Sequence, residues 1–171
     1  MLIRSTLLLG TVAGTLPAAA AQLKLEVDLP RMTVAEYHRP YVSAWIEKAS
    51  DQAFVGNIAV WYDVKKRDDG GAKWLKEMRQ WWRASGRGQQ ALADGVSGAT
   101  RPAGEHTIDL LQSKAGAALA PGRYQVVVEA AREHGGREVL RVPFEWPARE
   151  PQKLKVAGEG ELAGIGLEIA P

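Results

Sequence analysis

Hydrophobic and charged residues alternate strictly over residues 23–29. Every second side chain is apolar and those between are charged; the apolar ones are Leu23, Leu25, Val27 and Leu29. A period of two is typical of a strand with one buried face. Residues 41–48 and 54–62 are rich in β-branched and aromatic side chains. They predict two further strands, joined by a hairpin turn at residues 49–51.

The spacing of apolar residues changes between residues 74 and 82. They fall there at i, i+1, i+4, i+7 and i+8, on one stripe of a helix: Trp74, Leu75, Met78, Trp81 and Trp82. Gly70 and Gly71 precede this segment, and Gly86 follows it as a stop signal. The pattern predicts a single amphipathic helix of about three turns.

Strand-like segments return in the second half of the chain. Residues 106–111, 124–132, 140–146, 153–156 and 167–169 predict strands, and residues 89–104 predict a loop. His134-Gly135-Gly136 permits a tight reversal of the chain. Pro143 predicts an edge strand, because proline cannot donate to a sheet ladder. Seven or more short strands with one inserted helix predict a mainly β fold, an immunoglobulin-like antiparallel β-sandwich.

The first residues have the pattern of a secretory signal peptide. Arg4 supplies a positive charge, residues 5–16 are mostly apolar, and residues 18–21 are four alanines that suit a signal peptidase. The apolar run is too short to span a membrane. We therefore expect residues 1–21 to be a cleaved signal and residues 22–171 to form one exported domain.

The composition excludes several classes of function. The chain has no cysteine, which excludes a lipoprotein anchor, disulfides and thiolate metal sites. Its formal net charge is +2 without a long run of one sign, which argues against nucleic-acid binding. No two of the three histidines, His38, His106 and His134, have the spacing of zinc or copper ligands on one element. We therefore predict no metal site.

A short motif near the middle of the chain carries the most specific signal. Asp94 is followed by Ser97-Gly98-Ala99-Thr100. This pattern resembles the acceptor motif of bacterial proteins that carry FMN on a threonine through a phosphoester bond, attached by a separate flavin transferase. Thr100 is then the attachment residue.

The resemblance implies roles for the other motif residues. Asp94 and Ser97 would be recognised by the transferase, and the small residues Gly98 and Ala99 would give it clearance. We expect glycine at position 98 to permit φ > 0 and so turn the hydroxyl outward. Arg101 either pairs with the flavin phosphate or is a solvated loop residue. Arg101-Pro102-Ala103 lacks the second hydroxyl residue that such acceptors often place two positions after the threonine.

Two other features near the motif stay open at the level of sequence. His106 lies six residues after Thr100. The sequence leaves open whether its side chain approaches the flavin phosphate. Core packing is the commoner role of tryptophans in strands. The sequence also leaves open whether one of them reaches the Thr100 loop; the candidates are Trp45, Trp61 and Trp146. Ser97 lacks the Gly-x-Ser-x-Gly context of a hydrolase nucleophile, so we expect no catalytic triad and favour a redox carrier over an enzyme.

The chain as a whole resembles the predicted periplasmic family of unknown function 2271. The resemblance rests on segments in a fixed order: residues 40–46, 73–83, 97–102 and 129–137. It implies a periplasmic location and genomic company with PepSY-type membrane proteins and flavin transferases, which are the expected partners. We therefore predict an FMN-bearing electron carrier that works with a membrane reductase. The alternative is a cofactor-free binding module that assists a membrane partner, for example in iron or haem handling.

Overall fold

The computed structural model describes residues 21–85, 87 and 95–171. Residues 1–20 of the expected signal peptide, Gly86 and Asp94 lie outside these residues. The division into a signal and one domain therefore stays a prediction. Within the described residues, no helix has the length and apolar character needed to cross a membrane.

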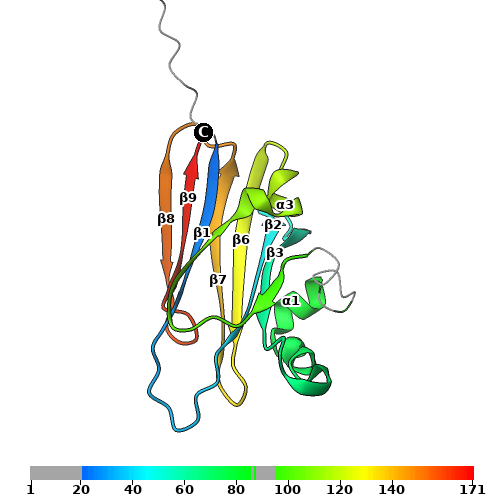
Figure 1. Cartoon of the computed structure of the whole chain (residues 1–171). Coiled ribbons are helices and arrows are strands. Elements are labelled where there is room, and N and C mark those ends of the chain that lie inside the picture. Colours follow the sequence, from blue (N-terminus) through cyan, green and yellow to red (C-terminus); the bar gives the residue numbers. More distant parts are fainter. Residues whose placement is uncertain (1–20, 86, 88–94) are drawn as a thin grey trace, which may run out of the picture.

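The strands form two sheets that face each other (Figure 1). The four-stranded sheet has the order β5 (Gly104–Asp109), β1 (Gln22–Leu29), β9 (Gly164–Ala170), β8 (Gln152–Ala157). The five-stranded sheet has the order β4 (Ser97–Ala99), β3 (Phe54–Tyr62), β2 (Tyr41–Lys48), β6 (Gly122–Ala131), β7 (Arg137–Trp146). This arrangement confirms the predicted mainly β sandwich.

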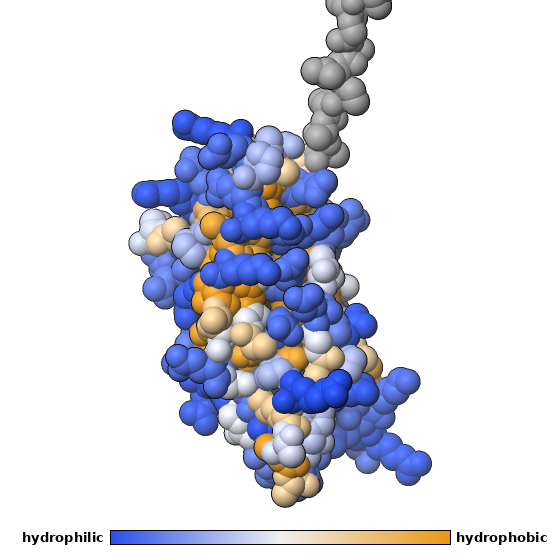
Figure 2. Space-filling model, turned by 90° about the vertical axis from the view of Figure 1, so that its left-hand side faces the viewer, coloured by the Kyte–Doolittle hydropathy of each residue, from blue (hydrophilic) through white to orange (hydrophobic). Residues whose placement is uncertain are grey.

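The alternating pattern of the sequence explains the core between the sheets. The four apolar side chains of β1 are at most 1% exposed, whereas Lys24, Glu26 and Asp28 are only half-buried. On β8, Lys153 and Lys155 are exposed, while Leu154 and Val156 pack against the core. Figure 2 shows the side at the left of Figure 1, where hydrophilic residues cover most of the surface and hydrophobic ones show between them.

The sandwich is not wholly antiparallel, because β4 pairs in parallel with β3. Residues 97–99 were expected within a loop, and that expectation is wrong. The segment is short and has no strand-like alternation, so the sequence offered no signal. The backbone of β3 supplies the pairing instead: Val60 N–H donates to the carbonyl of Val96 at 3.0 Å.

A helical segment covers the outer face of the five-stranded sheet. It consists of a 3-10 helix η2 (Ala72–Glu77) and a short α-helix α1 (Arg79–Ala84). Together with the outward side chains of the sheet it buries a second apolar cluster: Tyr41, Trp45, Val60, Leu75, Met78, Trp81, Val127 and Ala131. The predicted apolar stripe is thus confirmed, and it packs on the sheet.

The prediction of one continuous helix is wrong. Met78 has φ −77° and ψ 76°, which breaks the helix between η2 and α1. The Glu129 carboxylate on β6 accepts hydrogen bonds from the backbone N–H groups of Gln80 at 3.2 Å and Trp81 at 2.8 Å. These groups, at the start of a helix, have no partner of their own within it. A distant side chain therefore supplies the N-terminal cap, and local spacing could not reveal it.

Shorter helical pieces complete the chain: η1 (Arg67–Asp69), η4 (Leu110–Gln112) and α3 (Lys114–Ala117). The strand expected over residues 106–111 ends at Asp109. The Asp109 side chain accepts a hydrogen bond from the N–H of Leu111 at 3.0 Å, which begins η4. Asp is a favoured N-cap residue, so the early end of this strand has a local cause.

The hairpin between β6 and β7 turns where the sequence predicted. His134 takes the left-handed conformation, with φ 54°, and Gly135 N–H donates to the Arg132 carbonyl at 3.0 Å. Pro143 lies on β7, the edge strand of the five-stranded sheet. The prediction that Pro143 marks an edge strand is confirmed.

Candidate functional site

The motif residues after Asp94 lie at an edge of the five-stranded sheet. Ser97, Gly98 and Ala99 form β4, in register with Val60, Trp61 and Tyr62 respectively. Thr100 follows directly, and its N–H donates to the Tyr62 carbonyl at 3.1 Å. Thr100 is half-buried, and both Ala99 and Arg101 are exposed. The motif is therefore held by the sheet while remaining at the surface.

The expected positive φ at Gly98 is wrong. Among the described glycines, the left-handed conformation occurs at Gly95 (φ 70°) and Gly104 (φ 124°). These two residues flank β4 and the segment after it. Gly98 itself is paired within the strand, where extended backbone is required. The turns into and out of the motif, and not the motif itself, use glycine's conformational freedom.

A surface trough of about 630 Å³ lies beside β4, where the edge of one sheet approaches the edge of the other. Its walls come from β3, β4, β5 and the segments next to them; they include Trp61, Gly98, Arg101, Glu105, His106 and Asp109. The trough thus contains cationic and acidic groups together with one large aromatic ring. Thr100 does not itself line the trough, but Gly98, two positions before it, and Arg101, directly after it, do.

Trp61 is the tryptophan that lies beside the motif, which the sequence had left open. A methyl group built on Gly98 would lie 3.6 Å from Trp61 Cδ1. The guanidinium carbon of Arg101 lies 5.4 Å from the ring centroid of Trp61. The His106 ring meets the same tryptophan edge to face at 5.7 Å. Trp61 is 5% exposed, so it anchors the trough while Arg101 covers it.

His106 also holds the segment that follows Thr100. Its Nε2 lies 2.8 Å from the carbonyl oxygen of Pro102, so that nitrogen donates. The structure therefore brings Arg101 and His106 to one aromatic ring beside Thr100. Of the predicted site residues, Ser97, Gly98, Ala99, Thr100 and Arg101 are adjacent here, and Asp94 lies outside the described residues.

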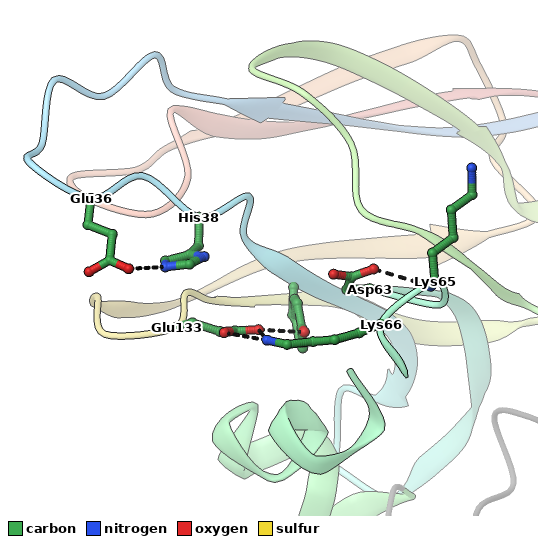
Figure 3. Close-up of polar contacts among 7 residues, drawn as sticks. Glu36, His38, Asp63, Lys65, Lys66 and Glu133 are labelled. Atoms are coloured by element: carbon green, nitrogen blue, oxygen red, sulfur yellow. Dashed lines mark hydrogen bonds and ion pairs between the residues drawn. The ribbon is translucent and has the colours of Figure 1, made fainter. Parts of the chain in front are cut away.

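A second polar cluster lies where the β6–β7 hairpin meets the loop between β1 and β2 (Figure 3). Glu133, 7% exposed, accepts hydrogen bonds from Tyr41 Oη at 2.8 Å and from Lys66 Nζ at 2.8 Å. Burial raises the pKa of Glu133, but the hydrogen bonds from Lys66 and Tyr41 outweigh it and hold that pKa below its ordinary value. Burial, with the bond to Glu133, raises the pKa of Tyr41.

Two histidines that are far apart in sequence meet at this end of the molecule. The rings of His38 and His134 lie 6.1 Å apart between centroids, and His38 Nε2 lies 3.1 Å from Glu36 Oε1. Sequence reasoning missed this group because it compared spacings within single elements. One histidine lies in the β1–β2 loop and the other in the β6–β7 turn, so only the folded chain joins them.

Comparison with known proteins gives one informative match. A family model described as "Predicted periplasmic protein (DUF2271)" matches residues 22–164. Neither the comparison with curated proteins nor that with solved structures gives a significant match. The matched range includes β4, the trough and the His38–His134 group.

Proposed function

This chain belongs to the DUF2271 family of predicted periplasmic proteins, and from that premise we propose that it carries FMN covalently on Thr100 and serves as an electron-transfer carrier. The observation that carries the proposal is the position of Thr100. It directly follows an edge strand of small residues, beside a trough that contains a tryptophan, an arginine and a histidine.

The attachment is a phosphoryl transfer made by another protein. The Thr100 hydroxyl oxygen attacks the flavin-side phosphorus of a flavin dinucleotide diphosphate. The new O–P bond replaces the bond to the nucleoside monophosphate, which leaves, and the hydroxyl proton passes to a base of the transferase. Such a reaction depends on positioning and charge stabilisation. An acceptor must therefore present its hydroxyl, and Thr100 is only partly covered at the end of an edge strand.

The residues beside Thr100 fit the group that they would hold. The phosphodiester keeps one negative charge, and Arg101 is the neighbouring cation, with His106 close to it across the Trp61 ring. Trp61, which is 5% exposed, supports Arg101 and His106 from beneath and so fixes this wall of the trough. The trough, of about 630 Å³, is in the size range of cofactor sites.

The flavin, when bound, supplies the electron transfer, and the protein supplies attachment and orientation. In this proposal Arg101 holds the phosphate, Trp61 holds Arg101 in place, and Ser97 with Asp94 is recognised during attachment. The partners are a flavin transferase and a PepSY-type membrane reductase, which the family resemblance implies. A periplasmic carrier lies on the side of the membrane where such a reductase would deliver electrons.

The test is the intact mass of the exported protein after co-expression with its flavin transferase. We expect a gain equal to one FMN less one water. Thr100→Ala should lose the gain, and Thr107→Ala, which removes a hydroxyl from the β5 wall of the same trough, should keep it. Labelled Thr100→Ala protein would refute this attachment site.

The runner-up is the cofactor-free binding module that assists a membrane partner. An unmodified mass, obtained in cells where a known acceptor is labelled, would support it. Capture of a membrane partner by the unmodified protein would then identify its role.

A further inference from the structure

Glu36, His38 and His134 place their ligand atoms close together at the protein surface. One atom from each side chain can be chosen so that all of them lie within 4.8 Å of one another. A tetrahedral ion with bonds of about 2.0–2.1 Å holds its ligand atoms about 3.3 Å apart. His38 Nε2 and Glu36 Oε1 already have such a spacing, at 3.1 Å. The Glu36 side chain is exposed, so it can turn to bring its carboxylate closer to both imidazoles.

The surroundings favour an ion and not a further salt bridge. Lys66 is paired with Glu133 at 2.8 Å, and Arg132 is paired with Glu161 at 3.1 Å. Lys66 and Arg132 therefore each have a carboxylate partner already. Among the described residues, the Glu36 carboxylate has His38 as its polar partner.

The backbone and one aromatic ring hold His134 in place. A non-glycine residue at φ 54° is uncommon, yet the turn has histidine there, although two glycines follow it. The Trp74 ring meets the His134 ring edge to face at 5.6 Å, which restricts the imidazole. His134 thus lies at the tip of a hairpin, where Trp74 of η2 contacts its ring.

We propose that Glu36, His38 and His134 form a binding site for a divalent transition-metal ion, Zn²⁺ or Cu²⁺. Imidazole and carboxylate are ligands that these ions accept. An ion bound to His38 Nε2 takes the place of the proton between that nitrogen and Glu36 Oε1. The neutral imidazole then carries its proton on Nδ1 instead. With three protein ligands, a coordination position stays open to water or to a ligand from a partner, as in sites where the ion exchanges or reacts.

The test is calorimetric titration of the mature protein with ZnCl₂ and, separately, with CuCl₂. The protein must be purified through a tag without histidine. We expect one ion per chain. His38→Gln and His134→Asn should each weaken binding at least about 10-fold, since even the loss of a supporting outer-shell partner costs that much. Asparagine is chosen at position 134 because it tolerates φ > 0, so the turn is preserved.

The matched control is His106→Gln. His106 is the remaining histidine of the chain and lies in the trough beside Trp61, so its loss should leave affinity unchanged. Zn²⁺ should also raise the Tm of the wild type and of the control, but not that of the His38→Gln/His134→Asn double variant. Equal affinity of the double variant and the wild type would overturn the proposal, and so would an equal loss in the control. The outcome does not depend on flavin attachment.

Discussion

Gly98 lies opposite Trp61 in the register of β3 and β4. A methyl group at position 98 would meet Trp61 Cδ1 at 3.6 Å, which is ordinary van der Waals contact. The fold therefore accepts alanine here. If a small residue is needed at this position, the requirement comes from a second protein that must approach Thr100.

We predict that Gly98→Ala leaves the free energy of unfolding unchanged or raises it by up to about 1 kcal/mol, because alanine restricts the unfolded chain. Flavin labelling by the transferase should become slower. Urea unfolding and a time course of labelling measure the two effects. Gly160→Ala is the control, since its added methyl would meet only Glu138 Oε2 at 3.5 Å, away from β4. Labelling of Gly98→Ala at the wild-type rate would show that clearance is not its role.

A buried carboxylate on β6 helps to attach the helical segment, η2 and α1, to the sheet. Glu129 is 0% exposed. It caps α1 through the N–H groups of Gln80 and Trp81, and it accepts a hydrogen bond from Arg137 at 2.8 Å. Trp81 Nε1 in turn donates to Asn57 Oδ1 at 2.8 Å. The element α1 is thus positioned by polar contacts from β3 and β6 as well as by its apolar stripe.

We expect Glu129→Ala to lower the free energy of unfolding by about 2–3 kcal/mol. The change removes a helix cap, typically about 1 kcal/mol, and leaves buried N–H groups without a partner, at about 1–3 kcal/mol. Arg137 is 36% exposed and can turn to water, so its loss adds little. Glu145→Ala, at an exposed position of β7, should change the free energy of unfolding by no more than about 0.5 kcal/mol. Equal midpoints for both variants in urea would contradict the role of Glu129.

The whole molecule has a closed and an open side. β7 and β8 lie against each other at one side of the sandwich, whereas the trough separates β5 from β4 at the other. The central strands β2 and β6 are nearly all buried, and β4 is short and at an edge. Stability should therefore be distributed unevenly, with the motif on the least protected strand.

We predict that native-state hydrogen exchange will reflect this arrangement. The amides of Ala44 and Val128, in central strands, should exchange only by global unfolding, and that of Thr100 by local opening with a lower free energy. Exchange followed by NMR against urea concentration separates the two processes. Protection of Thr100 equal to that of Ala44 would show that β4 opens only with the whole sheet.

Parts of the fold could be read from the sequence because their causes are local. The alternation in β1, the apolar stripe of residues 74–82 and Pro143 on an edge strand each express a rule about neighbouring residues. The motif around Thr100 was also visible as a pattern. Its secondary structure was not, because β4 exists only through pairing with β3.

By itself, the sequence determined that the chain builds a β-sandwich with an apolar helical segment, and which residues form the acceptor-like motif. The tertiary structure decided that Glu129 caps α1 after the break at Met78, that Trp61 is the aromatic ring beside the motif, and that His38 meets His134. Periodicity reports which face of an element is buried. Contacts between elements depend on how those faces are brought together, and that is settled only when the two sheets and the helical layer pack.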